Sequence, residues 1–211
     1  NGGTDKLDYR DVTVPEPDIL PLADSFPASG RELADWRDTF MIHAVSSFEP
    51  AAPGGDGQVV RVYDLSGGID AMSLGFLTDS DYAVEAMIYC DYRPELSSDG
   101  FERNGIFARD NGNGMFTGIS SSGIKGGNYS LTWDSHDGRV QCMRTVDGIP
   151  EDMLSEPRYE KSTAWRTFRI ECRGDEIRFL LDGEEILKAT DSTHPRGAFG
   201  IGHQENFLSN S

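Results

Sequence analysis

The segment from Trp165 to Gly202 reads WRTFRIECRGDEIRFLLDGEEILKATDSTHPRGAFGIG, and apolar and polar side chains alternate through most of it. A period of two is what a half-buried β-strand requires. Two glycine-bearing connections, Arg173-Gly174-Asp175 and Asp182-Gly183, are typical of tight turns between antiparallel strands. The segment therefore predicts strands in succession over Trp165–Cys172, Glu176–Leu181, Glu185–Ala189 and Gly197–Gly202.

The same texture extends upstream. Tyr82–Cys90 (YAVEAMIYC) alternates most clearly, and Asp137-Gly138 between two alternating runs is a strong hairpin signal. No stretch of about 12 residues has a clean helical period. The proline-containing residues 147–164 predict a long loop, with a short helix around Glu151–Ser155. The remaining predicted strands are Leu22–Phe26, Gln58–Asp64, Gly105–Arg109, Phe116–Ser120, Tyr129–Asp134 and Arg139–Val146.

Many short strands separated by turn signals are typical of β-sandwiches and barrels. We therefore predict an all-β fold in which two antiparallel sheets face each other. A chain of 211 residues fits one such domain and can bury a two-sheet core. Residues 1–21 hold three prolines and scattered charges with little periodicity, so we predict an extended arm or linker there. The sandwich is expected over residues 22–211.

The charge balance bears on possible partners. The chain has 36 acidic and 19 basic residues, which gives a formal net charge of −17. Such a surface repels phosphate backbones and anionic lipid headgroups, so nucleic-acid and membrane-surface roles are disfavoured. No apolar run is long enough to span a bilayer. The negative charge is explained by the solubility that an exported protein needs. A second possibility stays open, namely that some carboxylates bind calcium or line a site for neutral sugars.

Cysteine usage argues against a disulfide framework. The three cysteines, Cys90, Cys142 and Cys172, are few and odd in number, and each lies within an alternating run. We predict buried free thiols that pack as small apolar groups. A bond between Cys142 and Cys172 remains open, since it depends on whether their strands are neighbours.

The order of features from Trp165 to Gly202 resembles the second half of concanavalin A-like lectin/glucanase domains, which include laminin-G-like sandwiches and bacterial domains of unknown function. Upstream, YAVEAMIYCDY, GIFARDNG and NYSLTWDSHDGRVQC resemble the first half, so the resemblance covers residues 80–202. It implies a jelly-roll sandwich, a fold that carries carbohydrate-binding modules, glycosidases, lyases and adhesion domains. Such domains usually close with a further strand. Here either the arm before Leu22 takes that place, or the strand is missing from the chain as given.

Catalytic patterns are not evident. Retaining glucanases of this fold carry Glu-x-Asp-x-x-Glu on one strand, which sets two carboxylates about 5 Å apart. The nearest acidic cluster, Glu184, Glu185 and Asp191, has the wrong spacing. His203 and Gln204 with Arg109 and Tyr89 suggest a lyase set, but no lyase motif surrounds them. Zinc, phosphate-loop and nucleophile-elbow motifs do not occur. We therefore predict no catalytic residue.

Calcium is the only cofactor that the sequence leaves open. Hard cations need several oxygen ligands, and sandwich domains often hold one near the chain ends. Asp24 together with Glu205 or Asn206 is one candidate set, and the loop Asp110-Asn111-Gly112-Asn113 is another. An ordinary Asn-Gly turn explains the loop equally well.

Strand alternation selects candidate ligand contacts. If alternate residues of Tyr82–Cys90, starting with Tyr82, face the core, then Glu85, Met87 and Tyr89 face away. If Ile106 and Ala108 fill the core, their neighbours Phe107 and Arg109 leave it. Trp133 shares a face with Tyr129 and Leu131 and is predicted to be core, while Trp36 and Trp165 are predicted to lie in the core or at its edge. A solvated sheet face explains the exposed residues as well. The resulting ligand-binding candidates are Glu85, Tyr89, Arg109, Arg144, His203 and Glu205.

These observations favour a non-catalytic module of an exported bacterial protein that binds an oligo- or polysaccharide or recognises a cell surface. Two alternatives stay open, namely a polysaccharide-degrading hydrolase or lyase domain and a structural or protein-interaction module. The polar start at Asn1-Gly2-Gly3-Thr4 favours trimming after export. The expected location is therefore extracellular, periplasmic or on the cell surface, with lipid anchoring left open.

Overall fold

The computed structural model of this chain describes residues 37–40, 47–50, 58–61, 69–74, 78–92, 101–111, 126–157 and 161–206, with side chains from residue 78 onward except at 101, 157, 205 and 206. These residues form strands joined by turns, and no helix occurs among them. The strands are β1 (Arg37–Phe40), β2 (Ser47–Pro50), β3 (Gln58–Arg61), β4 (Ile69–Leu74), β5 (Tyr82–Cys90), β6 (Phe101–Asp110), β7 (Tyr129–Asp134), β8 (Arg139–Val146), β9 (Ile149–Pro157), β10 (Ala164–Arg173), β11 (Glu176–Leu181), β12 (Glu184–Thr190) and β13 (Ala198–Asn206).

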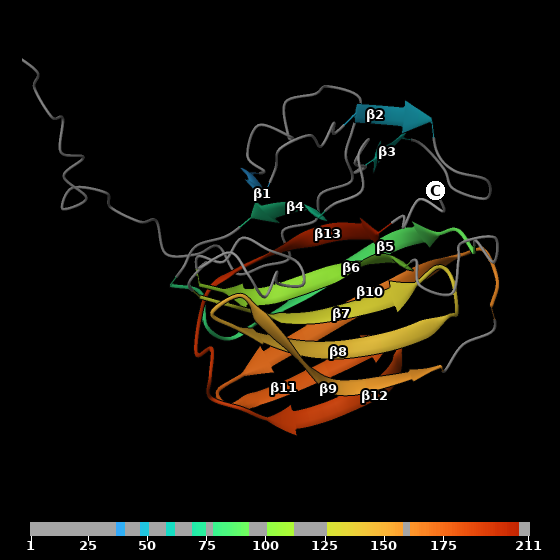
Figure 1. Ribbon diagram of the computed structural model, residues 1–211. Helices are drawn as coiled ribbons and strands as arrows, with labels where there is room; N and C mark the ends of the chain where they lie inside the picture. The colour runs from blue at the N-terminus through green and yellow to red at the C-terminus, as the bar shows by residue number, and fades with distance from the viewer. Residues whose placement is uncertain are drawn as a thin grey trace, which may run out of the picture.

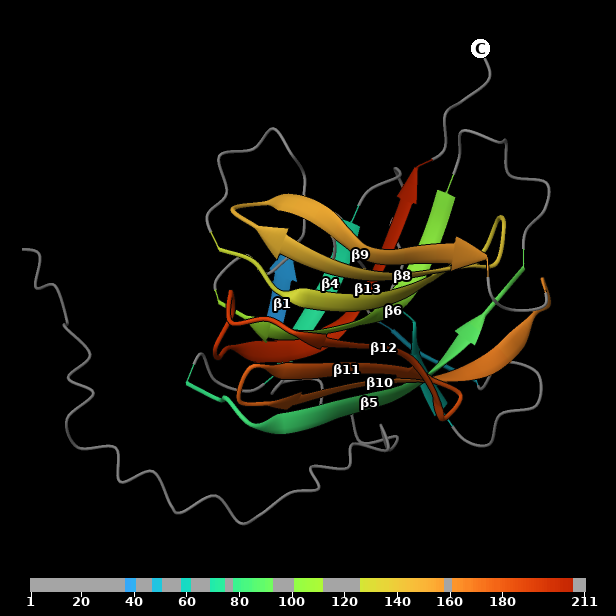
Figure 2. The same ribbon diagram turned by 90° about the horizontal axis from the view of Figure 1, so that it is seen from below.

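Two antiparallel sheets make up most of the described structure (Figure 1). The larger sheet has the order β1-β4-β13-β6-β7-β8-β9, and the smaller has the order β12-β11-β10-β5, while β2 and β3 pair separately. Figure 2 shows the sheets as two layers, with β5, β10, β11 and β12 in one layer and β6, β7, β8 and β9 in the other. The predicted two-sheet antiparallel sandwich is confirmed.

The core lies between the sheets, where alternate side chains of facing strands meet. Tyr129, Leu131 and Trp133 of β7 are fully buried there, as are Phe168 and Ile170 of β10. Burying one such side chain stabilises the fold by about 1.5–3 kcal/mol. The prediction that Trp133 is a core residue is confirmed. The other buried members of the cluster are Val84, Cys90, Ile106, Ala108, Val140, Cys142, Cys172, Ile177, Phe179, Leu181 and Ile186.

The prediction of a long loop with a short helix near Glu151–Ser155 is wrong, because residues 149–157 form β9 and pair with β8. The connection is a tight hairpin turn at Asp147 and Gly148, whose φ angles are 49° and 78°. Two successive positive φ angles are typical of the turn that Asp-Gly favours between strands. The prolines of this stretch are tolerated because β9 ends the order of the larger sheet, where prolines are admitted in strands.

All three cysteines are free and buried, as predicted. Cys142 belongs to β8 of the larger sheet and Cys172 to β10 of the smaller one, so their strands are not neighbours. Burial raises the pKa of Cys172 to about 11, which keeps this thiol protonated and poorly reactive at neutral pH.

Several predicted elements lie outside the described residues, namely the arm over 1–21, the strands Leu22–Phe26 and Phe116–Ser120, and Trp36. The boundary at residue 22 therefore stays a prediction. Of the predicted strand Gln58–Asp64, the first four residues are found as β3. In the described part of the chain, no helix has the length and apolar character needed to cross a bilayer.

Candidate functional site

Arg109 lies inside the sandwich, and the prediction that its side chain leaves the core for solvent is wrong. The side chain is fully buried. Its guanidinium donates hydrogen bonds to the carbonyls of Ser80 (2.9 Å), Gly174 (2.8 Å) and His194 (3.1 Å). A β-bulge is the reason: Arg109 has φ of 52°, and the register between β6 and β13 shifts beside it. The bulge interrupts the alternation, so extrapolation from Ile106 points Arg109 the wrong way.

His203 is also buried, so its predicted exposure is wrong. It lies within β13 opposite Asn104 of β6, and His203 Nδ1 is 2.9 Å from Asn104 Oδ1. The glycines of GAFGIG weakened the strand signal, so that the sequence placed His203 after the strand rather than in it. The Glu205 side chain and all of Asp24 lie outside what the structure describes, so their binding and metal roles stay predictions.

Arg144 joins three segments at one end of β7 and β8. It forms ion pairs with Asp191 (2.5 Å) and with Glu151, and Tyr129 donates a hydrogen bond to Asp191 (2.7 Å). Burial alone would raise the pKa of Asp191, but hydrogen bonds from Thr193, Tyr129 and Arg144 outweigh it and hold that pKa well below its ordinary range. Arg144 is thus partnered within the protein.

Glu85 and Tyr89 lie on the outer face of the smaller sheet, as alternation predicted. Glu85 is exposed and pairs with Arg169 (3.0 Å), while Tyr89 is half-buried beside Trp165. Trp165, predicted to lie in the core or at its edge, is thus half-exposed on this outer face. Arg109 points instead into the sandwich interior, and His203 belongs to the other sheet. The described candidates therefore do not converge on one site.

The larger sheet carries a different polar set on the face turned away from the core. Because Tyr129, Leu131 and Trp133 enter the core, the alternate residues of β7 point the other way. We call four of these outward-facing residues the polar strip: Ser130, Thr132 and Asp134 of β7 with Gln141 of β8. All four are buried, with at most 6% of their surface exposed.

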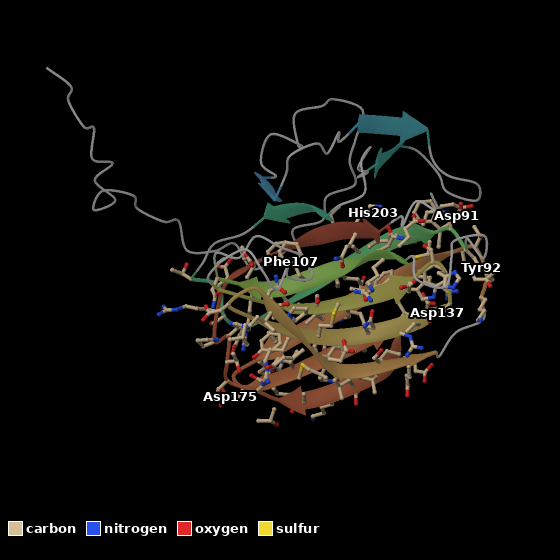
Figure 3. All side chains as sticks on the ribbon, viewed as in Figure 1. Asp91, Tyr92, Phe107, Asp137, Asp175 and His203 are labelled. Carbon is tan, nitrogen blue, oxygen red and sulfur yellow. The ribbon has the colours of Figure 1, made fainter. Side chains whose placement is uncertain are left out.

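The strand register arranges this face in rows. Ser130 lies between Phe107 of β6 and Met143 of β8. Both are buried yet outside the core cluster between the sheets, so Phe107 points to the outer face, as alternation predicted, but is not exposed there. Figure 3 labels Phe107 on β6. This row thus sets the Ser130 hydroxyl between two apolar side chains.

The second row is built around Thr132, which lies between Gly105 of β6 and Gln141 of β8. A side chain at Gly105 does not fit, because its Cβ would lie 2.0 Å from the carbonyl oxygen of Leu131. The row therefore has bare backbone on one side of Thr132 and an amide on the other.

Three oxygens of the polar strip have no hydrogen-bond partner within the described structure: Ser130 Oγ, Thr132 Oγ1 and Gln141 Oε1. The Gln141 amide nitrogen does have one, because it donates to Asp152 (3.2 Å). Buried polar atoms in native proteins are nearly always partnered by protein, water or ligand. Three oxygens without partners in the described structure thus lie in adjacent rows of one sheet face.

One end of the polar strip carries charge. Asp134 lies opposite Arg103 of β6, and Arg103 Nε is 3.6 Å from Asp134 Oδ2. Burial raises the pKa of Asp134 and lowers that of Arg103, so each group is held against desolvation by the other. The remainder of the polar strip is uncharged.

The two described carboxylates of this face, on Asp134 and Asp152, stand on strands that are not neighbours. Asp134 belongs to β7, and Asp152 belongs to β9, two strands away and in the row of Met143. Strand spacing and rise put the backbones of the two residues roughly 16 Å apart, and the Asp152 carboxylate is engaged by the Gln141 amide. Retaining and inverting glycosidases need about 5 Å and at most about 9.5 Å respectively.

The described residues offer no cluster of three or more histidine, cysteine or acidic side chains suited to a metal ion. In the predicted calcium loop, Asp110 accepts a hydrogen bond from Asn128, and Asn111 contacts both His194 and Gly127. These two side chains are thus engaged with the protein, while residues 112 and 113 lie outside the described ranges.

Sequence alternation alone did not find the polar strip. YSLTWD does place Ser130, Thr132 and Asp134 on one face, which was the available signal. A polar strand face ordinarily indicates exposure to water, however, and no sequence pattern reveals that hydroxyls are buried without partners.

Comparison with known proteins supports the fold. A scan against protein-family models gives no match, and a search of curated proteins finds none that is significantly similar. Among solved structures, carbohydrate-binding module CBM66 from Bacillus subtilis superposes with a TM-score of 0.53 at 15% identity, over 82% of this chain and 92% of that one. The Crh5 transglycosylase superposes with a TM-score of 0.51 at 13% identity, over 85% and 67% of the two chains.

A lichenase from a mouse hindgut metagenome is similar at a TM-score of 0.47 and 12% identity, over 83% of this chain and 82% of that one. Similarity at such low sequence identity supports a shared fold and says nothing about a shared function. The two superpositions with TM-scores above 0.5, together with the sheet order and the packed core, show that the chain has the concanavalin A-like jelly-roll fold.

Proposed function

We propose that this chain is a non-catalytic carbohydrate-binding module whose ligand contacts the polar strip. The observation that carries the proposal is the row of unpartnered oxygens on Ser130, Thr132 and Gln141. Leaving such a group buried and unpaired costs about 1–3 kcal/mol. A sugar presents closely spaced hydroxyls, each of which both donates and accepts hydrogen bonds, and so complements hydroxyl and amide oxygens together.

The surroundings of the polar strip favour a neutral sugar. Phe107 and Met143 flank Ser130 and supply apolar surface for the C–H groups of a sugar ring. The described cations of this face are already paired, Arg103 with Asp134 and Arg139 with Asp137. An acidic sugar would have to displace one of those carboxylates, whereas a neutral one leaves both ion pairs intact.

The polar strip is now shielded from water. In the complex that we propose, the ligand contacts it instead. The unpartnered oxygens gain hydrogen bonds in that complex, and this gain favours a polar occupant over an apolar one. We further propose that the module acts outside the cytoplasm, since polysaccharide ligands lie at or beyond the cell surface. Fractionation of cells that express the full gene product tests this location.

The experiment is affinity electrophoresis of the chain in gels that contain neutral polysaccharides (mixed-linkage β-glucan, xylan) or acidic polygalacturonate. We expect retardation by at least one neutral polysaccharide, and Thr132→Val to weaken it about tenfold, because one hydrogen bond to the ligand is lost. Thr190→Val is the matched control on exposed β12 and should migrate as wild type. Equal retardation of the Thr132 variant and wild type contradicts the role of the polar strip.

One observation favours a catalytic alternative. Asp134 is a buried carboxyl whose raised pKa suits a general acid for polysaccharide cleavage. On this alternative, incubation with the same polysaccharides releases reducing ends or unsaturated products, and Asp134→Asn abolishes the release. On the binding proposal no product appears.

A further inference from the structure

The outer face of the smaller sheet is covered mainly by ion pairs between neighbouring strands. Glu171 of β10 bridges Arg169 (2.7 Å) and Arg178 (2.6 Å), and the chain of pairs continues to Glu85 on one side and Glu185 on the other. Three carboxylates face two guanidinium groups here, so most of the charge is compensated. Most of this face is therefore an ordinary solvated surface.

The ion pairs end toward the last residues of β5, where apolar side chains take over. Tyr89 of β5 lies directly opposite Trp165 of β10, and their ring centroids are 5.4 Å apart at 62°. In the next row Met87 lies opposite Thr167 and is 62% exposed, one of two large apolar side chains so exposed in the described structure. Both aromatic rings are partly open to solvent.

Polar groups border this apolar area on both sides. Beyond Tyr89 and Trp165, the exposed Asp91 accepts a hydrogen bond from Thr163 Oγ1 (2.9 Å), and Asp91 is labelled at the end of β5 in Figure 3. On the other side, beyond Met87, lies the Glu85–Arg169 ion pair. Same-face residues along a strand are about 6.6 Å apart, so Glu85 and Asp91 stand about 20 Å apart with the apolar rows between them.

We propose that Tyr89 and Trp165, with Met87 beside them, form a second glycan-binding surface that stacks against the face of a pyranose ring. We call these three residues the aromatic platform. The C–H face of a sugar ring packs on aromatic and thioether groups, while the hydroxyls at its edge reach charged acceptors and donors at the borders. The platform offers that combination. A purely apolar partner would make no hydrogen bonds with Asp91 and Glu85.

The surface lies on the opposite sheet from the polar strip. The inference therefore goes beyond the proposed function and does not need the polar strip to hold. A chain with both surfaces can hold two segments of polysaccharide at once, which raises its apparent affinity for polymers over short oligomers.

The test measures binding of mixed-linkage β-glucan, xylan and polygalacturonate by affinity electrophoresis, together with acrylamide quenching of tryptophan fluorescence. We expect Trp165→Ala to weaken binding of at least one polysaccharide about tenfold, because a stacked ring is lost. Trp165→Phe keeps an aromatic face and should stay within about twofold of wild type. Glu185→Gln, at the far end of the same face, is the control and should have no effect.

Quenching supplies an independent readout. Trp133 is buried, whereas Trp165 is partly exposed. Bound polysaccharide should therefore shield wild type from acrylamide and leave the Trp165→Phe variant unprotected. A thermal unfolding midpoint equal to that of wild type shows that a variant is folded. If Trp165→Ala does not fold, Tyr89→Ala takes its place as the test variant.

The outcomes separate the two proposals. Loss of binding in the Thr132→Val variant, with folded Trp165→Ala and Tyr89→Ala unchanged, overturns the platform and keeps the polar strip. Loss in the platform variants alone keeps the platform and overturns the polar strip. Wild type that binds none of the three polysaccharides overturns both.

Discussion

Arg109 holds three segments of the sandwich together through hydrogen bonds to the backbone. Its guanidinium reaches the turn before β5, the β10–β11 turn and the segment after β12, through Ser80, Gly174 and His194. We expect Arg109→Met to lower the free energy of unfolding by about 3 kcal/mol or more, because buried carbonyls lose their donor. Urea denaturation measures this. Arg173→Ala, on an exposed residue of β10, should stay within about 0.5 kcal/mol of wild type.

His194 predicts a dependence of stability on pH. Its Nε2 is 2.7 Å from the carbonyl oxygen of Thr145, and its Nδ1 is 3.1 Å from Asn111 Nδ2. Asn111 Oδ1 already accepts from the Gly127 amide, so the Asn111 amide nitrogen donates to Nδ1 and the ring is neutral with its proton on Nε2. Burial lowers the pKa of His194, against the opposing effects of the Thr145 carbonyl and Asp191, and nearby Arg144 and Arg109 lower it further.

The sign follows from proton linkage. The folded state binds the His194 proton more weakly than the unfolded state, whose histidine pKa is about 6.5. The contribution of His194 to the free energy of unfolding is therefore fully present above that value, and it falls as the pH drops toward the lower pKa of the folded state. We expect the midpoint of urea unfolding to fall between about pH 7 and pH 5 in wild type, and less steeply in His194→Gln. Parallel pH profiles for the two proteins would refute this role.

At the scale of elements, β6 and β7 approach each other too closely to admit a side chain at Gly105. The Cβ of Gly105→Ala would meet the Leu131 carbonyl at 2.0 Å. We expect this variant to unfold or to lose about 3 kcal/mol or more, as a strained core substitution does. Circular dichroism and urea unfolding report it. Gly183→Ala is the comparison, because its Cβ meets nothing within 4 Å and only its φ of 81° costs stability, by about 1 kcal/mol.

The outer face of β7 predicts opposite effects on stability and binding. Thr132→Val removes a buried hydroxyl that has no partner in the described structure and keeps the side-chain shape. We expect the thermal midpoint to stay level or to rise, by an amount that corresponds to a gain of at most about 1 kcal/mol in the free energy of unfolding. Glycan affinity should fall. A loss of stability greater than about 1 kcal/mol would show that the hydroxyl has a structural partner instead.

The elements that the sequence predicted best are those with strong local chemistry. The strands from Trp165 onward and the Asp137-Gly138 hairpin follow from alternation and turn residues alone. β9 was missed because its prolines outweighed the Asp147-Gly148 turn signal, and proline tolerance depends on a strand being at a sheet edge, which is a property of the assembled sheet.

At the scale of the whole molecule, the sandwich could be predicted and the site could not. Alternation correctly placed Glu85 and Phe107 outside the core. Alternation failed at Arg109, where a bulge turns one residue inward. It also failed at His203, which lies within β13, whereas the glycine-rich sequence before it predicts the end of the strand. The polar strip depends on which oxygens remain unpartnered once the strands are registered, and that is a tertiary property.

A jelly-roll sandwich is by itself compatible with either binding or catalysis. What separates them is the placement of carboxylates on the outer face of the larger sheet. Among the described residues Asp134 and Asp152 stand two strands apart, and this separation is in line with our proposal of a binding module.

The most direct test is an NMR titration of the chain with an oligosaccharide of the polysaccharide that retards it most. Binding at the polar strip predicts that amide shifts concentrate on β6, β7 and β8 around Ser130, Thr132 and Gln141, while the sugar spectrum stays that of the intact oligosaccharide. Shifts that leave these three strands untouched, or sugar signals that change into those of shorter products, contradict it.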